Sequence, residues 1–95
     1  MPAFFIVNQL EVTDPDTMAE YRKDAVKNIE SAGGRFLVRG EVGERLEGDV
    51  SPARIIMIEF DDMAALKAWY DGPGYADLKR MRLSASRSDI FCVEA

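Results

Sequence analysis

The sequence predicts an α+β fold of the ferredoxin-like type, in which a four-stranded antiparallel sheet carries its helices on one face. Three observations indicate this class. Segments of strand-like alternation and of helical periodicity follow one another in the order β-α-β-β-α-β. One internal strand is apolar at nearly every position, as expected for a buried central strand. The 95 residues suffice for one hydrophobic core, so we predict a single ferredoxin-like domain over residues 1–95.

The first strand is predicted at residues 4–12, where successive side chains alternate between two faces and Asn8 interrupts an otherwise apolar face. A helix should follow over about residues 15–32. Asp14 is a good N-cap, and Pro15 stands at the first helical position, where its missing N–H costs nothing. The helix should end at Gly33 and Gly34.

The second strand is predicted at residues 35–39, with Phe36 and Val38 on one face and Leu37 and Arg39 on the other. The acidic, glycine-punctuated residues 41–52 are predicted to form a long hairpin arm or loop. The third strand, residues 53–60, should be buried on both faces.

The remaining elements are a broken helix and a final strand. A helix is predicted at residues 63–70, and the Gly72-Pro73-Gly74 sequence should break it. A second helical piece should run from Tyr75 to about Ala85, and the last strand should span residues 89–94.

Helices on one face would leave the opposite face of the sheet uncovered. An exposed apolar patch of several hundred Å² is uncommon on a monomer. We therefore expect a homodimer that packs sheet to sheet, because two-fold pairing is the commonest way to cover such a face. The residues expected there are Val7, Leu37, Ile55 or Met57, and Phe91 or Val93.

Composition narrows the classes of function. The chain is 47% hydrophobic and 31% charged, as ordinary globular proteins are. Its net charge of −5 offers no field that would attract phosphate backbones or anionic membranes, so we expect neither nucleic acid nor membrane as a partner. Without histidine, and with Cys92 as the single cysteine, we expect no metal and no cofactor. No signal peptide or membrane-length apolar stretch is recognisable, which favours the cytoplasm.

Several stretches of the sequence resemble the domain-of-unknown-function family numbered 1330. These are residues 33–40, 46–48, 54–60 and 68–75, followed by Arg82, and the resemblance as a whole extends over nearly the whole chain. Because that family is associated with the dimeric α/β-barrel superfamily, the resemblance implies the same fold and a sheet-to-sheet dimer. It implies no particular activity.

The sequence departs from the usual pattern of that family at two places. Glu41 stands where the family usually continues with another glycine. The segment from Tyr70 to Tyr75 reads Tyr-Asp-Gly-Pro-Gly-Tyr in place of the usual Tyr-x-Ser-Pro-Glu-Tyr. No role that rests on the serine or the glutamate is therefore carried over to this chain.

Five residues are candidate ligand contacts: Asn8, Arg39, Trp69, Tyr75 and Arg82. Arg39 and Arg82 would bring permanent positive charge into a partly apolar cleft, where they could bind a carboxylate or phosphate or instead pair with glutamates. Trp69 and Tyr75 flank the glycine-proline-glycine break and could wall a pocket there or belong to the core. Asn8 could orient a ligand or bond to backbone or water.

Three functions stay open at this point. The chain could bind a small anionic or aromatic molecule in a cleft between helix and sheet near Gly72-Pro73-Gly74. By analogy with relatives in the superfamily, it could be a cofactor-independent monooxygenase or isomerase in which arginine stabilises an enolate or carboxylate. It could also be a structural dimer without a ligand. The directions of the candidate side chains decide among these functions.

Overall fold

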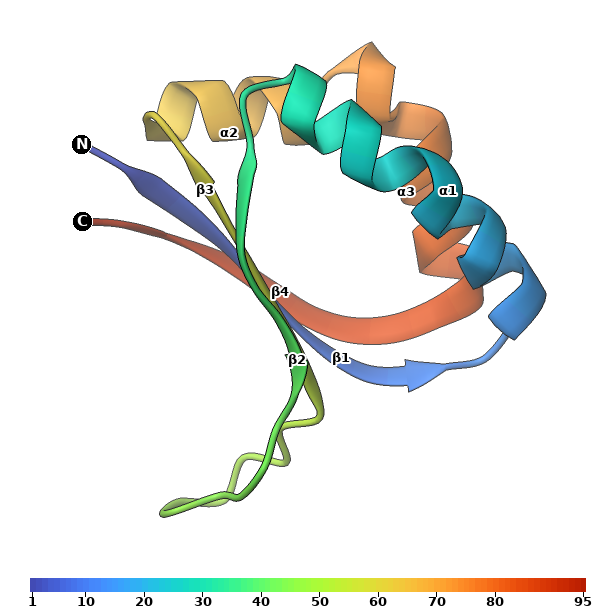
Figure 1. Ribbon diagram of the computed structural model, residues 1–95, viewed down its shortest axis with the longest axis vertical. Coiled ribbons are helices and arrows are strands. Elements are labelled where there is room, and N and C mark those ends of the chain that lie inside the picture. Colours follow the sequence, from blue (N-terminus) through green and yellow to red (C-terminus); the bar gives the residue numbers. More distant parts are fainter.

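The sheet and its helices form two layers, with all three helices on one face of the sheet (Figure 1). The computed structural model describes all 95 residues. Its elements are β1 (Ala3–Val12), α1 (Pro15–Ser31), β2 (Arg35–Glu41), β3 (Arg54–Phe60), α2 (Met63–Tyr70), α3 (Pro73–Ala85) and β4 (Ser86–Glu94). All strand pairs are antiparallel, in the order β2-β3-β1-β4. The predicted ferredoxin-like fold is confirmed, with α2 and α3 as its broken second helix.

The hydrophobic core lies between the sheet and the helices. Residues of β1 alternate between the two faces of the sheet, and Ala3, Phe5 and Val7 are the ones buried against the helices. The core cluster consists of Ala3, Phe5, Val7, Ala25, Ile29, Ile58, Phe60, Leu66, Trp69 and Tyr75.

Strand β2 contains an irregularity that reverses its alternation. Its register against β3 shifts between Phe36, which pairs with Ile58, and Val38. Arg39 then pairs with Ile56, two residues from Ile58, so Phe36 and Arg39 lie on the same, helix-facing side. The predicted grouping of Arg39 with the face opposite Phe36 was wrong, because a β-bulge inserts one extra residue between them.

Three boundaries differ from the predicted ones by two or more residues, and the first is the end of β2, which lies at Glu41 rather than at residue 39. Helix α3 begins at Pro73 rather than Tyr75, since proline fits the first turn of a helix. The turn before it needs glycine, because a Cβ on Gly72 would collide with the backbone carbonyl oxygen of Ala68. Strand β4 begins at Ser86, directly after α3, because Ser86 pairs with Val12 at the end of β1.

The sheet face turned away from the helices, called here the open sheet face, is largely apolar. The register of β1 with its two neighbours places Ile6 between Met57 and Phe91 on this face. Phe91 is 54% exposed. Val7 was wrongly expected here, because the odd-numbered positions of β1 face the helices and Val7 is buried there. The apolar residues of the open sheet face are Phe4, Ile6, Val38, Ile55, Met57, Phe91 and Val93.

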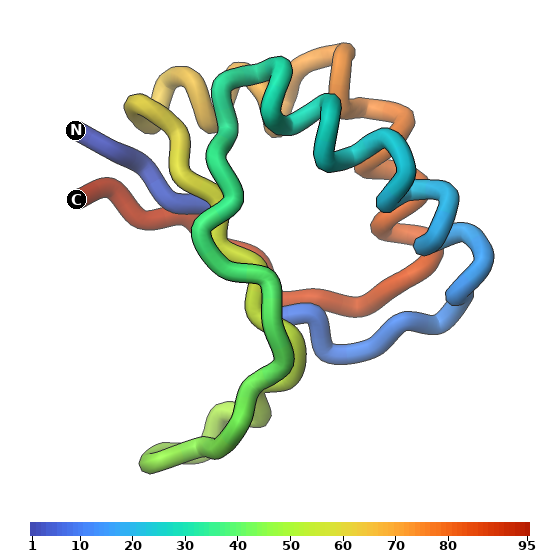
Figure 2. The backbone as a smooth tube through the Cα atoms, in the orientation of Figure 1, coloured from blue at the N-terminus to red at the C-terminus, as the bar shows by residue number.

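Residues 42–53 form an irregular arm between β2 and β3, as the predicted loop suggested. Figure 2 shows this arm extending past the sheet on the side away from the helices. Its apolar residues Leu46 and Val50 are 84% and 61% exposed. None of the three helices is long and apolar enough to cross a membrane.

Candidate functional site

A cavity of about 170 Å³ lies between α1 and the helix-facing side of the sheet. For comparison, an engineered apolar cavity of about 150 Å³ in another protein binds benzene, so the space suits a molecule with one ring. Its 16 lining residues come from α1, from strands β1, β2 and β3, and from α2 and α3. Its apolar wall is formed largely by Phe5, Ile29, Phe36, Ile56, Ile58 and Trp69.

The cavity exists because α1 is held by the other helices rather than by the sheet. Asn28 of α1 donates from Nδ2 to the carbonyl oxygen of Gly74 at 2.9 Å, and its Oδ1 accepts from Nε1 of Trp69 at 3.0 Å. Ala25, which α1 presents to the cavity, is buried but small. The space between α1 and the sheet is therefore left unfilled.

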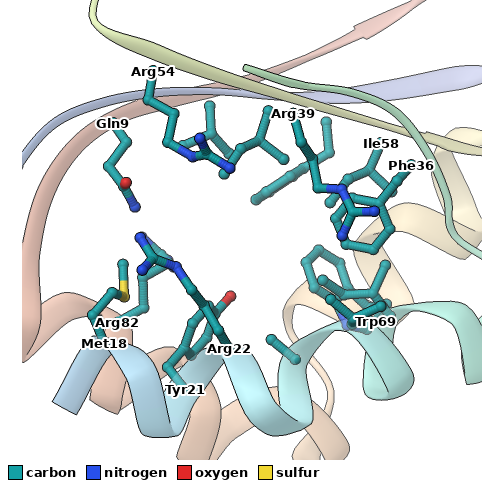
Figure 3. Close-up of a pocket in the computed structure, with 16 residues that line it drawn as sticks. Gln9, Met18, Tyr21, Arg22, Phe36, Arg39, Arg54, Ile58, Trp69 and Arg82 are labelled. Carbon is teal, nitrogen blue, oxygen red and sulfur yellow. The ribbon is translucent and has the colours of Figure 1, made fainter. Parts of the chain in front are cut away.

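Four arginines and no acidic residue line the cavity. Figure 3 shows Arg39 and Arg54 reaching in from the sheet, opposite Arg22 and Arg82 from the helices. Arg54 pairs with Glu41, at 3.3 Å between Nη1 and Oε1. The other three form no ion pair within the chain. Positive charge thus gathers at one place in a chain whose net charge is −5.

Arg82 is 7% exposed and is oriented by two tyrosines. Its Nε donates to the hydroxyl oxygen of Tyr75 at 3.2 Å, and that hydroxyl shares a hydrogen bond of 2.6 Å with the hydroxyl of Tyr21. Burial disfavours the charge of Arg82, but Tyr75, Tyr21 and Tyr70 together outweigh this effect, and the pKa of Arg82 lies above its ordinary value. Burial also raises the pKa of Tyr21, so both groups keep their protons at neutral pH.

Two arginine N–H groups in this region are buried without a hydrogen-bond partner. They are Nε of Arg54 and Nη2 of Arg82, and both side chains line the cavity. Buried donors are normally paired, because an unpaired one forfeits the hydrogen bond that it would make with water. A hydrogen-bond acceptor placed beside them would satisfy both donors.

The structure brings together three of the five predicted ligand contacts. Arg39, Trp69 and Arg82 line the cavity. Tyr75 is 1% exposed and lies behind Arg82 and Trp69, with its ring centroid 4.3 Å from that of Trp69. Asn8 lies elsewhere, because its place in the alternation of β1 turns it to the opposite face, where its Oδ1 accepts from the backbone N–H of Ala53 at 2.9 Å.

The sequence had suggested a cleft near the Gly72-Pro73-Gly74 break. The cavity lies elsewhere, and none of those three residues lines it. Sequence reasoning also missed four polar lining residues: Gln9, Tyr21, Arg22 and Arg54. Gln9 could have been found by continuing the alternation of the first strand from Phe5 and Val7. Arg54 could have been found in the same way in the third strand, from Ile58 and Ile56. No group of three His, Cys, Asp or Glu side chains is placed to hold a metal ion.

Gln9, Arg22 and Arg54 also line a shallow surface groove that adjoins the cavity. Glu41, the partner of Arg54, lies in this groove and not in the cavity. The shared residues therefore join the groove to this end of the cavity.

Comparison with solved structures supports the fold. A protein of unknown function from Rhodopseudomonas palustris matches with a TM-score of 0.78 and 18% identity, over 99% of this chain and 82% of that one. A dimeric ferredoxin-like protein of unknown function from Jannaschia sp. CCS1 matches with a TM-score of 0.71 and 14% identity, over the whole of both chains. SnoaB, a cofactor-independent oxygenase from Streptomyces nogalater, matches with a TM-score of 0.67 and 14% identity, over 99% of this chain and 92% of SnoaB.

These structures share the ferredoxin-like fold of this chain, and at such identities they show the fold alone. A search of curated proteins finds no significant match. The model of the domain-of-unknown-function family DUF1330 matches residues 2–95. The chain therefore belongs to the DUF1330 family, as its motifs had suggested.

Proposed function

We propose that the chain binds a small organic anion with an apolar or aromatic body in the cavity between α1 and the sheet. The observation that carries this proposal is the lining itself, which combines an apolar wall with four guanidinium groups and no carboxylate. Ligand sites are typically apolar cavities with a few converging polar groups. Guanidinium groups recognise carboxylates and phosphates through paired N–H donors.

The charge of the cavity favours an anionic ligand over a neutral one. Arg82 is almost fully buried, and its side chain makes one hydrogen bond, to the hydroxyl oxygen of Tyr75, and no ion pair. A buried charge without a counterion is costly, so an anion that enters the cavity offsets part of this cost. The same reasoning disfavours a purely structural role, in which the cavity arginines would be closed off by carboxylates of the chain.

Benzoate should bind at least tenfold more tightly than benzyl alcohol, which has a similar ring but no charge. Titration calorimetry at two salt concentrations measures both affinities, and added salt should weaken the binding of benzoate but not that of benzyl alcohol. Arg39→Met should weaken benzoate by roughly 3- to 10-fold through loss of one nearby charge. Arg80→Met is the matched control, because Arg80 is an exposed residue of α3 that pairs with Asp77 outside the cavity. Equal affinity for the charged and neutral probes would refute the proposal.

Cofactor-independent oxygenation is a second candidate function. The same guanidinium groups could stabilise an enolate or phenolate as it reacts with dioxygen, and SnoaB shows that this fold supports such an activity. A bound anion should then consume dioxygen and change mass when it is incubated with the protein in air. An unchanged mass for every bound compound would leave binding as the function.

We also propose that two copies of the chain pair through the open sheet face. The face is apolar, and the similar protein from Jannaschia is dimeric. Phe91→Arg places a charge within the proposed interface and should raise the dimer dissociation constant at least 100-fold, as expected when an unpaired charge is buried.

Light scattering coupled to size exclusion at micromolar concentration measures this effect. Leu83→Arg is the control, because Leu83 is 62% exposed on α3, in the other layer of the molecule. The wild type and Leu83→Arg should elute as dimers and Phe91→Arg as a monomer. A monomeric wild type would disprove the dimer.

A further inference from the structure

We infer that the ligand is an aromatic monocarboxylate whose carboxylate binds between Arg54 and Arg82, with its ring directed toward Phe36 and Trp69. This inference rests on the proposed function and adds the class and orientation of the ligand. It comes from the distribution of unpaired donors and apolar surface along the cavity.

Each of the two arginines is held by one partner and has another N–H free. In Arg82, Nε is bound to Tyr75, while Nη2 is buried and unpaired. In Arg54, Nη1 is bound to Glu41, while Nε is buried and unpaired. Because these partners already hold both side chains in place, little side-chain freedom remains to be lost when an anion binds.

The two unpaired donors belong to opposite walls of the cavity, since Arg54 comes from β3 and Arg82 from α3. A planar carboxylate has two oxygens and can accept one N–H from each guanidinium. Gln9 lies at the same end of the cavity (Figure 3), is 8% exposed and makes no side-chain hydrogen bond within the chain. Its amide supplies one more donor for the same group.

The opposite end of the cavity is aromatic. Phe36, Ile58 and Trp69 lie there, away from Gln9 and Arg54 (Figure 3). The guanidinium carbon of Arg39 lies 4.7 Å from the ring centroid of Phe36, so this cation already stacks on a ring. Only about 170 Å³ is available, which limits the body of the ligand to a single ring.

Side-chain NMR of the wild-type protein tests this arrangement without a substitution. Benzoate is titrated while the ¹H–¹⁵N signals of the arginine Nε groups are followed. The Nε–H proton of Arg54 should move downfield and exchange more slowly with water as its free N–H gains an acceptor. The Nε–H of Arg80, outside the cavity, should not move. Benzoate binding that shifts Arg39 and leaves Arg54 unchanged would overturn the inference.

Two variants supply an independent test. Arg54→Met and Arg82→Met should each weaken benzoate at least 30-fold, which is more than Arg39→Met does, while benzyl alcohol binds each as it binds the wild type. If Arg82→Met does not fold, Arg54→Met and the NMR titration decide the matter. If the wild type binds benzoate and the Arg39, Arg54 and Arg82 variants lose the same affinity, the proposed orientation of the ligand is overturned and the proposed function stands. No benzoate binding by the wild type would overturn the proposed function together with this inference.

Discussion

Replacing Trp69 by alanine should lower the free energy of unfolding by about 3 to 5 kcal/mol, the usual range when a buried tryptophan or phenylalanine is truncated in a core. Trp69 is 6% exposed, and its ring lies at the junction of both helix segments and the sheet. It stacks on Phe60 at 5.4 Å between centroids and meets Phe5 edge-on at 5.1 Å. Its Nε1 also ties α2 to Asn28 of α1.

Urea unfolding followed by circular dichroism measures this loss. Small proteins have m-values of about 1–3 kcal/mol/M, so the midpoint should fall by about 2 M. Trp69→Phe is the control, because it keeps an aromatic ring and loses the hydrogen bond to Asn28, at a smaller cost. If Trp69→Ala lowers the free energy of unfolding by less than about 1 kcal/mol, Trp69 is not the centre of this core.

The fold could be predicted because local signals in the sequence agree with one another. The alternation of β1, the Asp14-Pro15 start of α1 and the apolar run of β3 each specify one element by a local physical rule. In the structure, the carboxylate of Asp14 accepts from the backbone N–H of Thr17 at 3.1 Å, as an N-cap should.

The β2 bulge could not be predicted in this way. It depends on the register between β2 and β3, which is a property of two strands and not of either sequence segment. One inserted residue moved Arg39 to the face of Phe36. Alternation of β2 without the bulge would have turned Arg39 away from the cavity. The bulge therefore places this predicted ligand contact in the cavity lining.

The candidate site was predictable only in part, for a similar reason. The arginines and Trp69 were recognisable as residue types that suit an anion or a ring. The place of the cavity was not, because it follows from the tertiary contacts that hold α1 to α2 and α3. Helical periodicity shows which face of α1 is apolar, but it does not show how closely that face approaches the sheet.

Filling the cavity with a side chain of the protein should abolish binding and preserve the fold. Ala25 is the small residue that α1 presents to the cavity, and it is 4% exposed. Ala25→Phe adds a benzene-sized ring to a space of about 170 Å³. Benzoate affinity should fall at least 100-fold, while the melting temperature stays equal or rises, because cavity-filling substitutions commonly stabilise by about 0.5–2 kcal/mol.

Ala19→Phe is the matched control, because Ala19 is exposed on the same helix and lines no part of the cavity. It should leave benzoate affinity unchanged. If the larger ring overpacks the space, the fold loses about 1–3 kcal/mol, and Ala25→Leu then repeats the test with a smaller side chain. Benzoate binding that survives both substitutions at Ala25 in folded protein would place the ligand outside this cavity. Loss of binding with an intact melting transition would instead show that the empty volume itself is the site, since the arginines are untouched by the substitution.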